Sequence, residues 1–244
     1  MATNKLGLLP SQPCENQVQD SCLSVPTATY RNWLKAGDVM RQDIATISPH
    51  STVASAARIM SACKISCLIV SSDGHLSGIV TETDVLKKAV MTGHNFDQMK
   101  VEQIMSSPIR SIPQSLPIMD ASKIMELENI RRLVVQEDGR AVGIITQTDM
   151  VRVMASYIMS KEVSEIMTND VTVITSSARV REAAELMVSQ DISCLVVMDN
   201  DAVVGIFTER DLLRRVVAVN QNPAQIKLKQ VMSEPVVTIP ASCS

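Results

Sequence analysis

The sequence predicts an α/β protein made of repeated β-α-β-β-α units, and two recurring patterns are the basis of this prediction. In the first pattern a hydrophobic residue precedes a methionine, at Met40, Met105, Met167 and Met232. The second, Gly-hydrophobic-hydrophobic-Thr-x-x-Asp, begins at Gly78, Gly143 and Gly205. Each glycine follows a methionine by 38 positions (40 to 78, 105 to 143, 167 to 205). Three equal spacings indicate three copies of one unit, with no insertion inside any copy.

The connections between the copies predict the domain organisation. From the aspartate of the second pattern to the next methionine the chain runs 21, 18 and 21 positions (84 to 105, 149 to 167, 211 to 232). We assign unit 1 to residues 35–95, unit 2 to 100–158, unit 3 to 162–220 and the start of unit 4 to 227–244. Because equal connections favour equal geometry, we expect unit 1 to pair with unit 2, and unit 3 with unit 4.

Unit 4 is truncated in this sequence. Its glycine would lie 38 positions after Met232, beyond the last of the 244 residues. We therefore expect either a fragment of a longer protein or a chain that stops within a repeat. The sheet of unit 3 would then lack a partner, and an exposed apolar face of that kind favours association. This predicts either a homodimer, formed through unit 3 and more generally through the sheet or helix faces of the units, or a poorly behaved chain.

Within each unit the elements are expected in the same order, as unit 1 illustrates. A short apolar run at 44–47 predicts the first strand, and apolar residues at three- and four-residue spacing predict a helix over 53–60. Two further strands meet at the Asp-Gly dipeptide 73–74, which is typical of a tight hairpin. The last helix begins at the Thr-x-x-Asp sequence. A unit of about 55–60 residues buries too little surface to be stable alone, so the units should pair.

The first 34 residues differ from the rest. They are rich in Gln, Asn, Ser, Thr and Pro and have no hydrophobic period, which predicts a largely disordered segment over 1–34. Trp33 and Leu34 are expected to begin a short helix that packs on unit 1.

The composition excludes several classes of function. The five aromatic residues argue against a protein that stacks single-stranded nucleic acid on aromatic rings. A net charge of −3 argues against general electrostatic binding to DNA or to an anionic membrane. No run of apolar residues approaches the ~18 that a membrane span requires, and no signal peptide is evident. We expect a cytoplasmic protein.

Metal binding and catalysis are not indicated. The six cysteines include no C-x-x-C pair, and the three histidines match no metal-ligand spacing, so free thiols in a reducing compartment are expected. Motifs for nucleotide hydrolysis, dinucleotide binding, serine hydrolases and zinc proteases are absent from the sequence. We therefore expect no catalytic residues and no metal. The 15 methionines lie mostly at helical spacing and are interpreted as core residues.

The repeats resemble the cystathionine β-synthase (CBS) domain in their methionines, their element order and their three Gly-to-Asp motifs, over about residues 36–244. The resemblance implies that units pair through their sheets into a Bateman module with pseudo-two-fold symmetry, and that modules often pair again into a flat disk. It also implies clefts between paired units that bind AMP, ADP, ATP or S-adenosylmethionine, with no separate cofactor. Occupancy of these clefts would regulate an attached enzyme, channel or transporter.

The Thr-x-x-Asp sequences are the first candidates for ligand binding. Free N–H groups at the start of a helix suit a phosphate, and a carboxylate can accept hydrogen bonds from both hydroxyls of a ribose. The resemblance assigns the ribose to the aspartates and the phosphate to nearby hydroxyls. The candidate residues are Thr81, Thr83, Asp84, Thr146, Thr148, Asp149, Thr208, Arg210 and Asp211. The alternative is that each Thr-x-x-Asp is only a helix capping box.

A basic pair distinguishes unit 2 from the other units. Arg131 and Arg132 stand where units 1 and 3 have Ser-Cys, and the resemblance places phosphate-binding residues there. Arginine forks match phosphate oxygens well. The alternative is an exposed pair beside Glu126 and Glu128. Units 1 and 3 lack this pair, so their clefts would bind a less charged ligand or none.

The other candidates are three isoleucines, assigned by their position in the family, and a further basic residue, Arg210. Ile47, Ile112 and Ile174, on the first strands, would form an apolar slot for adenine, or would simply pack in the core. Arg210 would contact phosphate, or would be a solvated residue at a helix start. The basic pairs Lys87-Lys88 and Arg214-Arg215 are interpreted as solvated helix faces.

The sequence therefore predicts a non-enzymatic sensor of an adenosyl ligand. Two alternatives stay open: a CBS scaffold that only dimerises, and the regulatory part of an enzyme or transporter whose catalytic part lies after residue 244.

Overall fold

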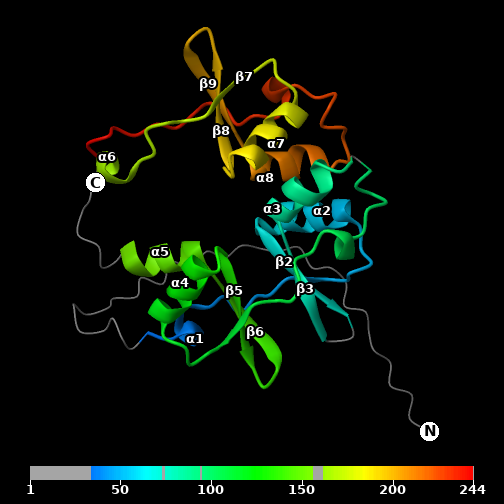
Figure 1. The fold of residues 1–244 in the computed structure, drawn as a ribbon, viewed down its shortest axis with the longest axis vertical. Coiled ribbons are helices and arrows are strands. Elements are labelled where there is room, and N and C mark those ends of the chain that lie inside the picture. Colours follow the sequence, from blue (N-terminus) through cyan, green and yellow to red (C-terminus); the bar gives the residue numbers. More distant parts are fainter. Residues whose placement is uncertain (1–33, 73–74, 94, 156–161, 244) are drawn as a thin grey trace.

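The computed structural model describes residues 34–72, 75–93, 95–155 and 162–243, which form three units of similar architecture (Figure 1). The expected disorder of the N-terminal segment falls outside these residues, apart from Leu34, and so does the Asp-Gly turn at 73–74. None of the helices in the described part of the chain has the length and apolar character needed to cross a membrane.

The elements follow one order in each unit. Unit 1 contains α1 (Ala36–Val39), β1 (Thr46–Ile47), α2 (Val53–Cys63), β2 (Cys67–Ser72), β3 (His75–Thr81), α3 (Glu82–Asp84) and the π-helical turn η1 (Val85–Val90). Unit 2 contains η2 (Val101–Gln103), β4 (Ser111–Pro113), α4 (Ile118–Leu127), β5 (Arg132–Glu137), β6 (Arg140–Thr146) and α5 (Gln147–Ala155). Unit 3 contains α6 (Val163–Ile166), β7 (Val173–Thr175), α7 (Val180–Ser189), β8 (Cys194–Asp199), β9 (Ala202–Thr208), α8 (Glu209–Leu212) and η3 (Leu213–Val217). The start of unit 4 contains η4 (Leu228–Gln230).

Each unit has its own three-stranded sheet. The first strand runs parallel to the second, and the second is antiparallel to the third. The predicted β-α-β-β-α order is therefore confirmed. In unit 2 the hairpin turn has Asp138 and Gly139 at φ 49° and 75°, the left-handed conformation that a two-residue hairpin loop requires.

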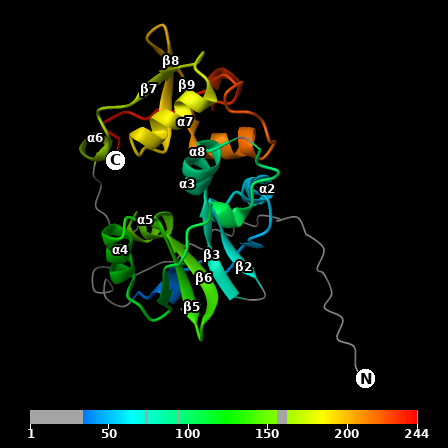
Figure 2. The same ribbon diagram turned by 45° about the vertical axis from the view of Figure 1, so that its right-hand side comes forward.

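Units 1 and 2 pair through their sheets. Ile69 of β2 packs against Val134 of β5 and Ile144 of β6, and all three are buried. Apolar residues around them close the contact from both sides. The expected pairing of unit 1 with unit 2 is confirmed, and Figure 2 shows the two sheets next to each other.

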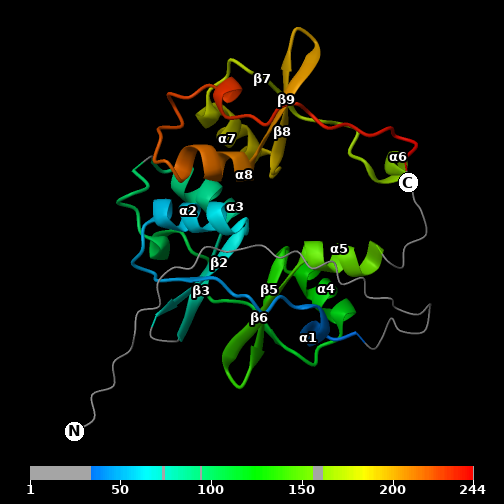
Figure 3. The same ribbon diagram turned by 180° about the vertical axis from the view of Figure 1, so that it is seen from behind.

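Units 1 and 3 meet through their helices instead. One hydrophobic cluster contains α2 and η1 of unit 1 together with α7 and η3 of unit 3. Hydrogen bonds cross the same contact: Arg58 Nε donates to Ala218 O at 2.9 Å, and Arg181 donates to Val90 O at 3.0 Å. Figure 3 shows these helices stacked between the two sheets. This contact places unit 3 beside the unit 1–unit 2 pair.

The methionine segments cross between paired units. Arg41, after the methionine of unit 1, exchanges two 2.9 Å backbone hydrogen bonds with Ile144 of unit 2. Ser106 of unit 2 bonds in the same way to Ile79 of unit 1, and Ser233 of unit 4 to Ile206 of unit 3. Positions 79 and 106 correspond to 206 and 233 at a constant offset of 127. The predicted pairing of unit 3 with unit 4 therefore has the same start as that of unit 1 with unit 2.

The short helix α1 belongs to this exchanged segment. Ala36 N donates to Leu116 O of unit 2 at 2.8 Å, and Leu34 packs against the core of unit 2. The expectation that this helix packs on unit 1 is therefore wrong. Sequence proximity suggested unit 1, but the chain crosses to the partner before its first strand begins.

The sheet of unit 3 is open on the face that unit 1 uses for pairing. Val171 and Val203 are 53% and 52% exposed. Their counterparts at the 127-residue offset, Ile44 and Leu76, pack in the unit 1–unit 2 contact. The described part of unit 4 contacts unit 3 at Ser176, Ala178 and Ile206, and its end reaches the methionine segment of unit 3, where Val163 N donates to Cys243 O at 2.8 Å.

Candidate functional site

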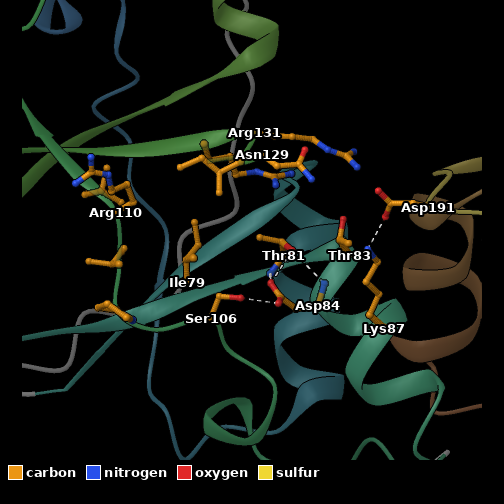
Figure 4. A pocket seen from close by; sticks show the side chains of 15 residues that line it. Ile79, Thr81, Thr83, Asp84, Lys87, Ser106, Arg110, Asn129, Arg131 and Asp191 are labelled. Carbon is orange, nitrogen blue, oxygen red and sulfur yellow. Dashed lines mark hydrogen bonds and ion pairs between the residues drawn. The ribbon is translucent and has the colours of Figure 1, made fainter. Parts of the chain in front are cut away.

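A cleft of about 290 Å³ lies between units 1 and 2. Its walls come from β3 and the start of α3 in unit 1, and from the entry to β4 and the start of β5 in unit 2 (Figure 4). The lining residues that concern the chemistry are Thr81, Thr83, Asp84, Lys87, Ser106, Arg110, Arg131, Arg132 and Asp191. Of the candidate residues predicted from the sequence, the structure thus brings together the motif of unit 1 and the basic pair of unit 2.

Asp84 is the buried acid of this cleft, with 7% of its surface exposed. Its Oδ2 accepts hydrogen bonds from Thr81 N at 3.0 Å and Thr81 Oγ1 at 2.7 Å, while Asp84 N donates back to Thr81 Oγ1 at 3.1 Å. This is the capping box. On the other oxygen, Oδ1 accepts from Ser106 Oγ and from Lys88 Nζ, both at 2.8 Å. All four acceptor positions of the carboxylate are therefore used.

The opposite wall carries the arginines of unit 2. Arg131 is exposed, whereas Arg132 is partly buried and its Nη2 donates to Ser66 Oγ of unit 1 at 2.7 Å. The buried Nε of Arg132 has no hydrogen-bond partner within the described residues. Arg110, at another end of the cleft, pairs with Glu128 at 2.8 Å. The exposed guanidinium of Arg131 and the neighbouring guanidinium of Arg132 are together suited to bind phosphate oxygens.

Lys87, Arg214 and Arg215 are exposed, as expected for solvated helix faces, whereas Lys88 is partly buried, and all four make polar contacts. Lys87 lines the cleft, and Lys88 donates to Ile104 O at 2.9 Å as well as to Asp84. In unit 3, Arg215 likewise donates to Val231 O at 2.8 Å, and Arg214 Nε to Ser61 Oγ at 3.3 Å. Lys88 and Arg215 make these contacts because the methionine segment of the neighbouring unit presents its carbonyl groups next to them.

The apolar side of the cleft differs from the prediction. It is formed by Ile79, Pro108, Ile109, Ile130 and Val134. The proposed slot residues lie elsewhere: Ile47 and Ile112 are 6% and 4% exposed in the cores of units 1 and 2, and Ile174 packs against the core shared by units 1 and 3. None of the three lines this cleft. Of the two interpretations, the structure places them in the core.

The motif of unit 2 lies apart from this cleft. Asp149 forms the same capping contacts with Thr146, with its Oδ2 accepting from Thr146 Oγ1 at 2.6 Å. Its Oδ1, however, is 3.0 Å from Arg41 Nε of the exchanged segment of unit 1. Arg41 thus occupies the place that Ser106 has at Asp84, while Thr148 is exposed. Asp149 therefore has a cationic partner from the neighbouring unit, whereas the cation at Asp84, Lys88, comes from its own unit.

The motif of unit 3 faces a second cleft, of about 630 Å³. Thr208 and Asp211 form a capping box, and Ser233 Oγ donates to Asp211 Oδ1 at 2.8 Å. Arg210, Arg214 and Arg215 line this cleft, and Arg210 also reaches Glu82 of unit 1 at 3.3 Å. One wall of this cleft is formed by the start of unit 4.

One acid of unit 3, Asp191, lines the first cleft, and a second, Glu209, contacts Thr83 of its wall; the sequence analysis identified neither. Asp191 pairs with Lys87 at 2.6 Å, and the hydrogen bond from Lys87 lowers the pKa of Asp191. Thr83 Oγ1 donates to Glu209 Oε2 at 3.1 Å. Burial raises the pKa of Glu209, which the hydrogen bond from Thr83 opposes. No sequence pattern could reveal these contacts, because they depend on how unit 3 docks on unit 1.

The thiol of Cys67 lies close to this region, and burial raises its pKa, so it is a protonated thiol at neutral pH. Within the described residues no group of three or more His, Cys, Asp or Glu side chains is arranged to hold a metal ion. The arrangement can bind an anion and a polar group side by side.

Comparisons with known proteins agree with the fold. The CBS domain family model matches residues 36–90, 101–156 and 163–218. Protein MK0525 of Methanopyrus kandleri is 34% identical over 122 residues, covering 49% of this chain and 62% of that protein. Protein MJ1225 of Methanocaldococcus jannaschii is 31% identical over 160 residues, covering 60% of this chain and 56% of MJ1225. The matches thus span less than two thirds of either relative.

Two further similarities concern a solved structure and part of an enzyme sequence. The crystal structure of MJ1225, described as a candidate archaeal homologue of g-AMPK, matches 84% of both chains with a TM-score of 0.70 and 20% identity. It shows a shared fold. A homoserine O-acetyltransferase of Methanohalobium evestigatum is 34% identical over 122 residues, which cover 49% of this chain and 24% of that enzyme.

Proposed function

Because the chain belongs to the CBS domain family, we propose that it is a non-catalytic regulatory module that binds a phosphorylated adenosine between units 1 and 2. The observation that carries this proposal is the pairing of Asp84 with Arg131 and Arg132 on facing walls of one cleft. The acid comes from one unit and the two arginines from the other. A ligand that contacts both would therefore join the units.

The chemistry of the walls suggests how the ligand lies. The ribose would contact Asp84 Oδ1, where its hydroxyls would replace the hydrogen bonds from Ser106 and Lys88. The phosphate would contact the exposed guanidinium of Arg131 and the guanidinium of Arg132, which also lines the cleft. The adenine would lie on the apolar side, which Ile79 and Ile109 provide.

Anionic ligands are favoured over S-adenosylmethionine. The cations Lys87, Arg110, Arg131 and Arg132 line the cleft, against the acids Asp84 and Asp191. S-adenosylmethionine brings a sulfonium cation and no phosphate, so it gains less from these arginines. We therefore propose AMP, ADP or ATP as the ligand.

Regulation would follow from the change in the arrangement of the two units. A ligand shifts an equilibrium between two arrangements only by its difference in affinity for them. At a concentration ~100 times its dissociation constant, a ligand specific for one arrangement stabilises it by about 2.7 kcal/mol. The match to a chain named as an acetyltransferase makes an enzyme one class of regulated partner.

The test is a thermal-shift and calorimetric titration with adenosine, AMP, ADP, ATP and S-adenosylmethionine. We expect stabilisation by a phosphorylated adenosine in the wild type and in Asp149→Asn, and its loss in Asp84→Asn. The two variants are matched, because both aspartates belong to capping boxes. An absence of stabilisation at millimolar concentration, or equal loss in both variants, would contradict the proposal and favour a scaffold.

Association through unit 3 is a second proposed role, based on its open sheet face. The same face of unit 1 is covered by a CBS sheet, so the face of unit 3 suits another such sheet. We propose that a second copy of this chain supplies it, with the two unit 3 sheets related by a two-fold axis. Such a dimer is compatible with ligand binding between units 1 and 2.

A further inference from the structure

Asp191 is the residue of unit 3 that lines the cleft between units 1 and 2. Its Oδ1 lies 2.6 Å from Nζ of Lys87. In Figure 4 this pair stands at the end of the cleft beyond Thr83, whereas Ile79 lies on the other side of Asp84. The third unit therefore contributes a negative charge to a site that the other two units build.

The position of this carboxylate is fixed by the docking of α7. Arg181 of α7 donates from Nη1 to Val90 O at 3.0 Å and from Nη2 to Met91 O at 3.1 Å, which holds the helix on unit 1. The chain then turns at Asp191, which has a φ of 52°, and Ile192 N closes the turn on Met187 O at 3.0 Å. The backbone thus places Asp191 at the cleft, where its side chain pairs with Lys87.

The second cleft lacks such an acid. At the 127-residue offset, Lys87 corresponds to Arg214, and Asp191 corresponds to Lys64. The described residues that line the second cleft include three arginines and no carboxylate except Asp211. The acid opposite the helix cation is therefore particular to the cleft between units 1 and 2.

We propose that Asp191 determines ligand specificity in this cleft by disfavouring additional phosphates. The inference rests on the proposed binding of a phosphorylated adenosine. The ribose would lie at Asp84 and the first phosphate at Arg131. Because the Lys87–Asp191 pair lies beyond Thr83 on this side of the cleft (Figure 4), further phosphates would approach Lys87, whose ammonium is paired with Asp191. Each added phosphate must take Lys87 from that carboxylate or stand next to it. The cleft therefore prefers AMP to ATP.

The size of the effect is limited by solvent. The side chains of Lys87 and Asp191 are 41% and 68% exposed, so water and salt screen their interaction. Exposed ion pairs of this kind change an equilibrium by a factor of about two to five per charge. The preference should be measurable as a ratio of affinities and should shrink as the salt concentration rises.

The test compares the full chain with Asp191→Asn and a control, Asp201→Asn, by titration with adenosine, AMP and ATP without divalent cations. Asparagine tolerates the left-handed backbone at both positions, and Asp201 lies in the exposed β8–β9 turn with a φ of 61°. For Asp191→Asn we expect ATP to bind about fivefold tighter, AMP at most about twofold tighter and adenosine unchanged. The control should match the wild type.

The outcomes separate the two proposals. If the compounds bind but Asp191→Asn leaves the ratio of AMP to ATP affinity unchanged, or shifts adenosine equally, the role of Asp191 is overturned and the proposed function stands. If no compound binds any of the three proteins, the proposed function is overturned and the specificity role falls with it.

Discussion

Ser106 Oγ lies 2.8 Å from Asp84 Oδ1, although the two residues belong to different units of the repeat. The same contact joins Ser233 to Asp211 at 2.8 Å. In both places the methionine segment of one unit donates a hydrogen bond to the motif aspartate of its neighbour. The capping box and the contact between units therefore share one carboxylate. A ligand bound at that carboxylate would act directly on the contact between the two units.

Replacing Ser106 by alanine should weaken this contact between units 1 and 2. The change removes a donor to a buried carboxylate, and hydrogen bonds to charged groups contribute about 1.5 kcal/mol or more. We expect Ser106→Ala to lower the free energy of unfolding by about 1.5 kcal/mol, measured by urea denaturation. Ser189→Ala, which loses only an exposed bond to Leu186 O, serves as control. Equal stability of the two variants would show that the contact adds nothing.

The close approach of Met40 to Gly143 gives a second prediction. A Cβ at Gly143 would lie 2.7 Å from Met40 Cγ, so Gly143→Ala should overpack this contact and cost about 1–3 kcal/mol of stability. Gly93→Ala is the control, because nothing stands within 4 Å of its Cβ position. Shortening the methionine in Gly143→Ala/Met40→Ala should restore part of the loss. A double variant no more stable than Gly143→Ala alone would refute the steric explanation.

Arg131 should discriminate phosphate from nucleoside. It is exposed on the cleft wall, so Arg131→Gln should leave the fold intact. Loss of a charge-assisted hydrogen bond should weaken AMP binding by about tenfold and adenosine binding by less than twofold. Calorimetric titration measures both. Arg140→Gln, at the start of β6 and outside the cleft, should bind AMP as the wild type does, and an equal loss there would point to net charge alone.

Glu209 should make stability depend on pH. Burial raises the pKa of Glu209 above 4.5, so the folded protein retains a proton that the unfolded chain has lost. The free energy of unfolding therefore falls as pH rises from about 4.5 through the folded pKa. Glu209→Gln cannot ionise, so its stability relative to the wild type should increase from about pH 4 to about pH 7.

Denaturation at each pH measures this difference. Glu182→Gln, an exposed position on α7, provides the matched control. If the difference between the wild type and Glu209→Gln does not change with pH, or changes in the opposite direction, the burial of this carboxyl has no energetic consequence.

Sedimentation equilibrium tests association through unit 3. We expect the 26.6 kDa chain to form dimers that Val203→Glu dissociates, because the new charge would enter the apolar sheet contact. Leu127→Glu places the same charge on an exposed apolar position of unit 2 and should leave the dimer intact. A wild-type chain that stays monomeric at high concentration would rule out this interface.

Much of the fold was predictable because it depends on local sequence patterns that repeat along the chain. The constant spacing from Met40 to Gly78 predicted rigid copies, and the equal connections predicted which units pair. That spacing could not show that Met40 contacts the glycine of the other unit, Gly143, because two identical units satisfy the same count either way. The exchange between units is a property of tertiary structure alone.

The candidate site was predictable in its polar part and not in its apolar part. Asp84 and Arg131 were found because their residue types stand out at aligned positions. For Ile47 the sequence could not decide between the slot and the core, because β1 has only two residues and a strand that short shows no alternation of faces. Asp191 was missed because its partner lies in another unit, so no spacing along the chain reveals it.

The crossing of the methionine segments bears on how such a chain can be cut, lengthened or recombined. If the chain were cut at each methionine, every piece would contain one full repeat of the sequence. It would still lack the methionine segment that binds to it, because that segment belongs to the neighbouring unit. A recombination that keeps each methionine segment with the unit it binds must exchange two units together. The constant offset of 127 positions is the length of such a pair. The smallest piece of this protein that can be exchanged with its contacts intact is therefore a pair of repeats.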